Sequence, residues 1–276
     1  MRLGGWLGLA GVVALLALAG AGDRVAGVGF TTQSPERALE GPGPEHWMGT
    51  DALGRDLAAR IAEGARISLL VAVGATAIAL AIGVAYGAVS GWAGGRTDGW
   101  MMRMVDVVYS LPDILLIVLW TELLRSLLGP IPDLYRRVGA LVGALGLVGW
   151  VSIARLVRGL VLQARAEAWV EAARAAGATP LRIVVRHVLP NLAAPILVTA
   201  TFRIPAAILA ESTISFIGLG IQPPFASWGV LAADGFAAMR SYPYLIAFPG
   251  AAIAVTLLAF QLLGEALRRK LNPRGV

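Results

Sequence analysis

Residues 67–92 read ISLLVAVGATAIALAIGVAYGAVSGW, an apolar run without one charged side chain. An α-helix rises about 1.5 Å per residue, so roughly 20 apolar residues cross the hydrocarbon core of a bilayer. This run is long enough for one complete crossing. The sequence therefore predicts a membrane-spanning helix at residues 67–92.

Five further runs of similar character lie on either side of this one. They are about Leu3–Ala21, Met101–Leu128, Gly139–Leu162, Leu192–Ile217 and Pro243–Leu263. Together they predict an all-α integral membrane protein with six transmembrane helices. The composition agrees, because 57% of the 276 residues are hydrophobic and only 14% are charged. Soluble domains carry about 25% charged residues.

The first run also resembles a secretory signal peptide. Arg2 precedes the apolar stretch, and Ala17-Leu18-Ala19 resembles a cleavage site. The apolar core is longer than the roughly 7–15 residues of such signals. We therefore expect a retained helix at residues 1–22.

Six crossings place both chain ends on the same side of the membrane. With the N-terminus inside, thirteen Lys and Arg residues fall in inside segments and eight in outside segments. Because cytoplasmic loops are enriched in basic residues, the predicted topology is N-in and C-in. The external loop is then expected at 23–65, a core of five helices at 66–264 and the cytoplasmic tail at 265–276.

Composition excludes several kinds of site. The chain has no cysteine, and His46 and His187 alone are too few for a histidine-built metal centre. No P-loop and no HExxH motif is present, and Gly49–Arg55 (GTDALGR) lacks the lysine of a phosphate loop. The net charge of +6 lies in short clusters between apolar runs, which indicates membrane topology and not nucleic-acid binding. Any uphill transport must draw on a partner or an ion gradient.

The longest segment expected inside, Glu167–Pro195, reads EAWVEAARAAGATPLRIVVRHVLPNLAAP. Glu167–Ala176 favours a helix, and Gly177 stands where a helix end favours a left-handed residue. Thr179 suits an N-cap and Pro180 the first position of a second helix. Two short helices joined at a glycine are therefore predicted. Periodicity alone fits a docking element for a soluble partner and an interfacial helix on lipid equally well.

Within this loop, Glu171-Ala172-Ala173, Gly177 and Leu189-Pro190 resemble the EAA motif of bacterial ABC importer permeases. The longer stretch VEAARAAGATPLRIVVRHVLPN resembles the peptide/nickel branch of that family, in particular its dipeptide- and oligopeptide-permease C-type subunits. Four other stretches agree, in order along the chain. They are HWMGTDALGRDLAARIAEGARISL (His46–Leu69), GWAGGRTDGWMMRMVDVVYSLP (Gly91–Pro112), AESTISFIGLGIQPPFASWG (Ala210–Gly229) and NPRG (Asn272–Gly275).

The resemblance implies an ABC importer type I-like permease in the bacterial inner membrane. It implies four kinds of partner: a second, homologous permease subunit, two ABC ATPase subunits, an extracytoplasmic solute-binding protein and membrane lipid. This subunit would have no catalytic residue and no directly bound cofactor, because ATP and Mg²⁺ would be held by the ATPases. The solute would be a peptide, with nickel, glutathione, opines and other small solutes still open.

The resemblance also assigns the loop at 164–192 to coupling with the ATPase. The residues that it places there are Glu171, Ala172, Ala173, Gly177, Arg182, Arg186, His187, Leu189 and Pro190. For the charged members two alternatives stay open. Glu171 either contacts the ATPase or merely forms a local helix pair with Arg174. The basic residues either pair with carboxylates of the ATPase or bind lipid phosphates.

Charged residues inside spans are costly, so they indicate either function or pairing. Asp106 and Asp113 are seven residues apart in the third run, which predicts that they lie nearly on one helix face. Arg203 and Glu211 lie in the fifth run, which lines the pathway in the family that the chain resembles. For all four residues, ligand contact and interhelical pairing both stay open.

The external segment Gly218–Tyr242 is only half polar, which suits a stretch folded back onto the rim of the bundle. Its notable residues are Gly218, Gly220, Pro223, Pro224 and Trp228. We expect them to form a gate or a contact for the binding protein, with a structural plug as the alternative. Trp228 can also be a membrane-interface aromatic.

Two other classes of protein compete with this prediction. A self-contained, ion-coupled secondary transporter would need no ATPase, yet no internal repeat of the kind that marks many such carriers is visible. An intramembrane enzyme would need a nucleophile with a base. Ser110, Ser212 and Ser215 fit better as helix-packing hydroxyls. Neither class accounts for the ordered motifs.

Overall fold

The computed structural model of the protein describes residues 3–22 and 27–271. Within these residues every regular element is helical, and β pairing is limited to an isolated bridge between Thr50 and Asp56. The predicted all-α fold is confirmed. The NPRG motif at Asn272–Gly275 lies outside the described residues.

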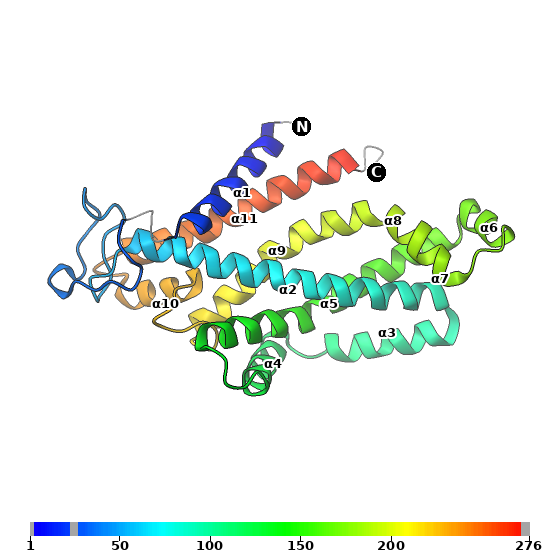
Figure 1. Ribbon diagram of the computed structural model, residues 1–276, viewed down its shortest axis with the longest axis horizontal. Helices are drawn as coiled ribbons and strands as arrows, with labels where there is room; N and C mark the ends of the chain where they lie inside the picture. The colour runs from blue at the N-terminus through cyan, green and yellow to red at the C-terminus, as the bar shows by residue number, and fades with distance from the viewer. Residues whose placement is uncertain (1–2, 23–26, 272–276) are drawn as a thin grey trace.

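Five of the described helices are long and apolar enough to cross a membrane. They are α1 (Leu3–Ala21), α2 (Leu57–Ala93), α5 (Asp133–Arg165), α9 (Ala193–Phe216) and α11 (Tyr244–Leu271). A sixth crossing results if α3 (Gly95–Tyr109) and α4 (Asp113–Leu127) are counted together as one broken span. Figure 1 shows α2, α5 and α9 running lengthwise through the molecule.

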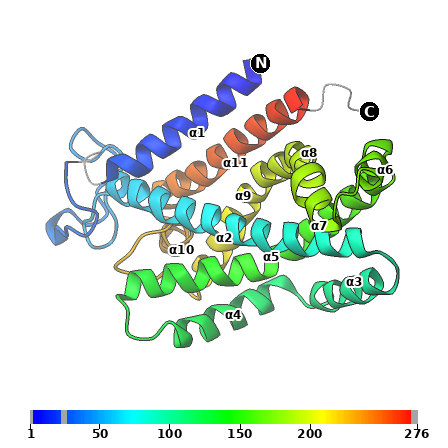
Figure 2. The same ribbon diagram turned by 45° about the vertical axis from the view of Figure 1, so that its right-hand side comes forward.

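The short elements lie at the two ends of this bundle. One end carries α6 (Ala168–Ala175), α7 (Pro180–Ile183), the π-helical turn η3 (Val184–Val188) and α8 (Leu189–Asn191). The other end carries η2 (Pro35–Arg37) within the segment 27–56, together with α10 (Trp228–Ala238). The start of α1 and the end of α11 lie side by side, away from α10 (Figure 2).

The contact between α2 and α5 is a backbone contact made possible by glycine. A Cβ atom added at Gly87 would lie 2.4 Å from the carbonyl oxygen of Ala154. One added at Gly91 would lie 2.8 Å from the carbonyl oxygen of Arg158. Small residues allow such close packing in membranes, where helix association depends on van der Waals contact more than on exclusion of water.

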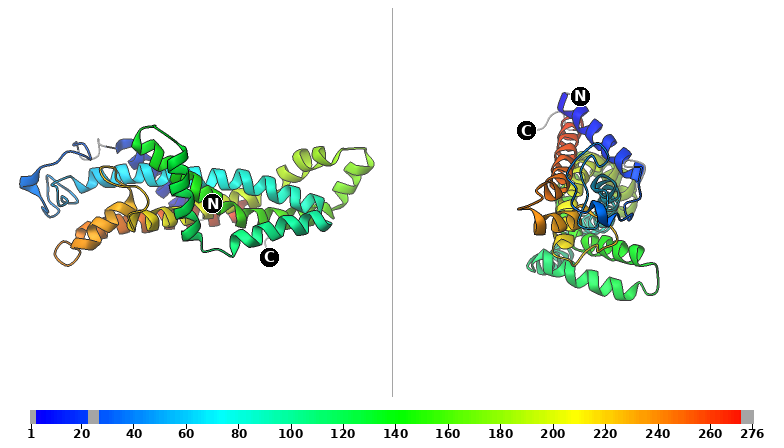
Figure 3. Two further views of the ribbon diagram at one scale, coloured as in Figure 1. Left: turned by 90° about the horizontal axis from the view of Figure 1, so that it is seen from below. Right: turned by 90° about the vertical axis from the view of Figure 1, so that its left-hand side faces the viewer.

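The helix α1 lies outside the central bundle and packs on α11. Added Cβ atoms at Gly8 and Gly11 would lie 2.5 Å from the backbone nitrogen of Leu263 and 2.8 Å from the Cβ of Ala259. Seen end-on, α1 and α11 form one side of the molecule, and α3 and α4 form the opposite side (Figure 3).

The prediction of one continuous third span at Met101–Leu128 is wrong. The chain leaves the helix after Tyr109, and α3 and α4 meet at 90° (Figure 3). The break falls at Ser110–Pro112, and Pro112 is compatible with it, since proline has no N–H to donate and disfavours a helical conformation of the residue before it. A new helix then begins at Asp113.

The helix α2 begins at Leu57, well before the predicted apolar run at residue 67. Its N-cap is Asp56, whose side chain accepts a hydrogen bond of 2.9 Å from the backbone N–H of Ala59. The first turns of α2 are therefore part of a folded unit at the α10 end of the molecule, where the sequence predicted a loop.

If backbone contact holds α2 against α5, Gly87→Ala lowers the thermal stability of the purified protein in nanodiscs. The methyl group would collide with the Ala154 carbonyl, and overpacking of this kind costs about 1–3 kcal/mol. Gly159→Ala on α5 is the matched control, because no atom lies within 4 Å of its added Cβ. Equal melting temperatures for the two variants would contradict the packing argument.

Candidate functional site

The α6–α7 loop is built around Gly177. This residue has φ of +79°, a left-handed conformation that glycine adopts without strain. Its N–H donates to the carbonyl of Arg174 at 2.9 Å, and the N–H of Ala178 donates to the carbonyl of Ala173 at 3.1 Å. These are the two hydrogen bonds of a Schellman motif, and they end α6. Thr179 then caps α7, so the predicted pair of helices joined at a glycine is confirmed.

One face of this loop is anchored to the bundle. Val170 of α6, Ile183 of α7 and Val188 of η3 are buried, and they belong to one apolar cluster with Val157 and Val161 of α5. The loop is therefore fixed to the helical bundle by buried apolar contacts. Its buried side chains pack on the end of α5.

The opposite face is open. Leu181 is 74% exposed and Val185 is 56% exposed, which is unusual for aliphatic side chains in so well anchored a segment. Leu181 and Val185 were not among the residues predicted for coupling. Of those that were, the exposed ones are Glu171, Ala172, Gly177, Arg182, Arg186, His187 and Pro190. Ala173 and Leu189 are half-buried.

The charged residues of the loop differ in their partners. Glu171 forms an ion pair of 2.7 Å with Arg174, whose guanidinium also stacks over Trp92 at 5.2 Å. This is the local pair that the sequence left open. The side chains of Arg182, Arg186 and His187 contact no hydrogen-bonding or ionic partner within the described chain.

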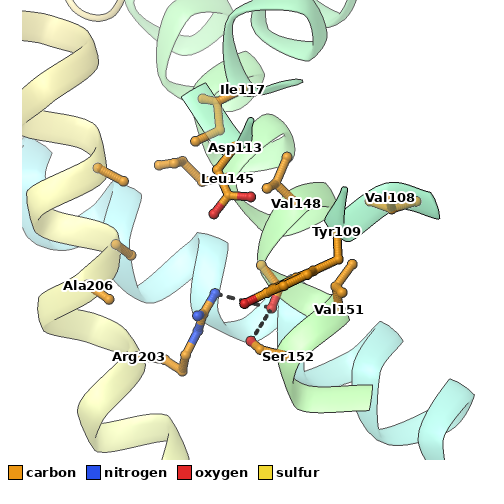
Figure 4. Close-up of a pocket in the computed structure, with 13 residues that line it drawn as sticks. Val108, Tyr109, Asp113, Ile117, Leu145, Val148, Val151, Ser152, Arg203 and Ala206 are labelled. Atoms are coloured by element: carbon orange, nitrogen blue, oxygen red, sulfur yellow. Dashed lines mark hydrogen bonds between the residues drawn. The ribbon is translucent and has the colours of Figure 1, made fainter. Parts of the chain in front are cut away.

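A second candidate site is a cavity of about 330 Å³ among α3, α4, α5 and α9. Asp113 and Arg203 face it from α4 and α9, and Tyr109 contributes its phenol from the end of α3 (Figure 4). Nη2 of Arg203 donates to the carbonyl oxygen of Gly149 at 3.1 Å. The rest of the lining is mostly aliphatic. Two opposite charges thus share one apolar-walled space.

Asp106 does not share a helix face with Asp113, so that prediction is wrong. The break at Ser110–Pro112 turns α4 away from α3 and separates the two carboxylates. Asp106 instead pairs with Arg155 of α5 at 2.7 Å. It therefore takes the pairing role that the sequence allowed.

Glu211 is fully buried and joins three helical segments. Its carboxyl accepts hydrogen bonds from the hydroxyls of Ser68 at 2.9 Å and Ser215 at 2.8 Å. Ser212 and Ser227 are further hydroxyl partners. The same Ser68 hydroxyl accepts from the backbone N–H of Trp228 at 3.3 Å, so one polar cluster connects α2, α9 and the start of α10.

The segment after α9 divides into buried and exposed residues. Trp228 is 0% exposed and its indole N–H donates to the carbonyl of Ile61 at 3.1 Å, so it packs in the core and not at the membrane interface. Gly220 is also buried, against Ser215. Gly218, Pro223 and Pro224 are exposed, and the bond between the two prolines is cis.

At the α10 end, an ion cluster that the sequence did not predict fixes the segment 27–56 to the bundle. Asp51 accepts from Arg55 and Arg60, each at 2.6 Å, and Arg60 also reaches Asp234 at 3.3 Å. Burial acts to raise the pKa of Asp51. The Arg60 charge and hydrogen bonds from the N–H groups of Arg55 and Leu53 outweigh burial, so this pKa lies below its ordinary value.

Sequence reasoning missed one further set of structural residues. Asp98 accepts from Ser90 at 2.6 Å and from both Nε and Nη2 of Arg158, at 2.5 and 2.6 Å. The available signal was the placement of one acid and one base near the same end of neighbouring spans. Without the distances across the bundle, that signal does not single out a pair.

Comparison with known proteins adds to this geometry. Residues 83–275 match the model of a family described as binding-protein-dependent transport system inner membrane component. The chain is 38% identical over 245 residues to the oligopeptide transport system permease protein of Bacillus subtilis (strain 168), covering 89% of this chain and 77% of the relative.

Two more relatives are similar. The dipeptide transport system permease protein of the same Bacillus strain is 46% identical over 234 residues, covering 84% of this chain and 70% of the relative. The oligopeptide transport system permease protein of Haemophilus influenzae is 40% identical over 229 residues, covering 83% of this chain and 70% of the relative. The match therefore extends through both candidate sites.

The lowered pKa of Asp51 predicts acid sensitivity of the segment 27–56. A carboxyl with a lowered folded-state pKa stabilises the fold above its unfolded pKa of about 4, and this stability is lost as pH falls through the folded value. Amide hydrogen exchange of this segment in nanodiscs, normalised for intrinsic rates, should therefore accelerate below about pH 4.

Asp51→Asn should show the fast exchange already at neutral pH, because it leaves buried Arg60 without its nearest anion. Glu36→Gln, on the exposed turn η2, is the control and should behave as the wild type. Unchanged exchange in Asp51→Asn would show that the ion cluster does not hold the segment.

Proposed function

This chain belongs to the family of binding-protein-dependent transport system inner membrane components, and from that premise we propose that it forms half of the translocation pathway of an ATP-driven importer. It is a multi-pass inner-membrane permease, and as a permease subunit it is not itself an enzyme. Membership implies an ATPase and a solute-binding protein as partners.

In the proposed complex, this chain pairs with a second, homologous permease subunit above two ATPase subunits. ATP and Mg²⁺ are bound by the ATPases and not by this chain. The chain ends and the α6–α8 loop face the cytoplasm, and α10 with the segment 27–56 faces the binding protein. The bias of basic residues toward the cytoplasmic segments supports this orientation.

The observation that carries the proposal is the α6–α8 loop. It extends beyond the ends of α2 and α3 (Figure 1), so it reaches a soluble partner below the membrane. Its buried face rests on α5, and its outer face presents Leu181, Val185 and unpaired basic side chains. An apolar centre with charges around it suits a protein interface. We therefore favour docking of this loop on the ATPase over binding of the loop to the lipid surface.

The proposed solute is a di- or oligopeptide or a related small molecule. Two of the relatives carry oligopeptide transport in their names and a third carries dipeptide transport. The cavity between Asp113 and Arg203 lies among the helices that would line the pathway. A self-contained, ion-coupled carrier is the alternative, and it differs in needing no ATPase.

The test is co-purification in mild detergent with all candidate partners expressed together. We expect an ATPase to remain bound to the wild type and to be lost from Gly177→Asp and Glu171→Lys. The first change strains the left-handed turn and the second reverses a charge on the docking face. ATP-dependent uptake should fall at least about tenfold, the factor that corresponds to 1.4 kcal/mol of lost binding free energy.

The chain offers a matched control for each change. Gly129 also has positive φ and open space around its Cβ position, but lies in the α4–α5 connection. Glu122 pairs with Arg125 three residues on, as Glu171 does with Arg174, but lies on α4. Gly129→Asp and Glu122→Lys should keep the ATPase. A protein that purifies alone, transports without ATP and ignores all four changes would be a secondary carrier.

A further inference from the structure

The charges of the transmembrane cavity are arranged differently from two ion pairs elsewhere in the bundle. Arg155 with Asp106, and Arg158 with Asp98, are closed pairs with contacts of 2.7 Å and 2.5 Å. Asp113 and Arg203 face one cavity from α4 and α9 without a contact within 4.0 Å, although each is in the field of the other. Structural pairing accounts for the closed pairs but not for this open one.

Arg203 is held in place with most of its donors free. A guanidinium has five N–H donors, and the contact to the Gly149 carbonyl uses one of them. A Cβ at residue 149 would lie 2.5 Å from Nη2 of Arg203, so glycine is what makes room for the guanidinium here. The hydrogen bond to the Gly149 carbonyl therefore orients the guanidinium against α5.

Asp113 is placed by the break between α3 and α4. It is the first residue of α4, directly after the non-helical turn at Ser110–Pro112, and no hydrogen-bond partner for its carboxylate lies within the described chain. Tyr109, the last residue of α3, closes the same side of the cavity. Non-helical backbone at membrane depth is tolerated where it lines a cavity, and broken helices form the solute sites of many transporters.

The remaining walls of the cavity are lined by aliphatic side chains. They are formed mainly by Ile117, Leu145, Val148, Ala206 and Ala210. A volume of about 330 Å³ is at the lower end of the range of small-molecule sites. Asp113 is exposed and Arg203 is half-buried, so both side chains can be reached by a ligand that enters the cavity. A carboxylate and a guanidinium that do not meet each other favour a ligand with complementary charges.

We propose that this cavity is a binding site for a dipolar solute that carries an ammonium and a carboxylate group. The guanidinium of Arg203 binds the carboxylate, and Asp113 accepts hydrogen bonds from the ammonium. A solute with two charges of the same sign is disfavoured, because one of the two residues would repel it. This assignment rests on the proposed function and adds to it the chemical class of solute at this position in the pathway.

The absence of native cysteine allows a direct test. Ala206→Cys places one thiol in the cavity, and Ser241→Cys places a control thiol at an exposed position between α10 and α11, outside the cavity and the spans. The complete importer is reconstituted in nanodiscs without binding protein, in nucleotide-free and ATP-bound states. The rate of modification by a neutral methanethiosulfonate reagent is read by mass spectrometry on peptides of this chain. The probes are dialanine, dialanine amide, N-acetyl-dialanine and N-acetyl-dialanine amide.

We expect dialanine to slow modification of Cys at position 206 in at least one nucleotide state and to leave the control thiol unaffected. Each single-capped probe should need a concentration at least about tenfold higher, because it loses one charge-assisted hydrogen bond. Arg203→Gln should remove the preference for a free carboxylate but keep that for a free ammonium. Asp113→Asn should do the reverse.

Equal protection by all four probes, or none by dialanine in either state, would overturn the assignment. So would a loss of both preferences in each variant, which would indicate a general disturbance of the cavity. ATP hydrolysis stimulated by the binding protein is measured on the same preparations. A complex that hydrolyses and transports but shows no protection contradicts only this inference, whereas one that never assembles with an ATPase contradicts the proposed function itself.

Discussion

The close approach of α2 and α5 is the constraint on which the positions of the other parts of the structure depend. In a bilayer, apolar side chains gain little by leaving lipid for protein, so helices associate where their backbones can come close. Gly87 and Gly91 provide such a surface on α2, against Ala154 and Arg158 of α5. Because α5 is fixed in this way, the carbonyl of Gly149 is available to hold Arg203, and the end of α5 is available to support the α6–α8 loop.

The elements that the sequence predicted well are those determined by local chemistry. The fifth span was predicted at Leu192–Ile217 and is observed as α9 at Ala193–Phe216, because hydrophobic length alone decides such a helix. The loop joined at Gly177 was predicted because Gly, Thr and Pro have strong preferences at helix ends, and all three act over a few residues. Neither the fifth span nor the loop at Gly177 requires knowledge of the rest of the chain to be predicted.

The features that the sequence did not predict depend on contacts between distant segments. Pro205 and Pro249 lie inside continuous helices, whereas Pro112 stands at a break of 90°, so the presence of proline does not decide where a span bends. Trp228 is buried because Ile61 and Ser68 of α2 meet it, residues about 160 positions away. Asp113 could not be placed in a cavity until the bend itself was known.

The two candidate sites are joined by one helix, α5. Val157 and Val161 of α5 pack against the α6–α8 loop, and Gly149 and Ser152 of the same helix line the cavity, about two turns away. A continuous helix transmits a displacement over that distance with little loss, because its interior is close-packed. Arg203 is bound to α5, whereas Asp113 is on α4, beyond the break. A push on the loop that shifts α5 relative to α4 would therefore change the separation of the two charges, and with it the affinity for a solute that bridges them.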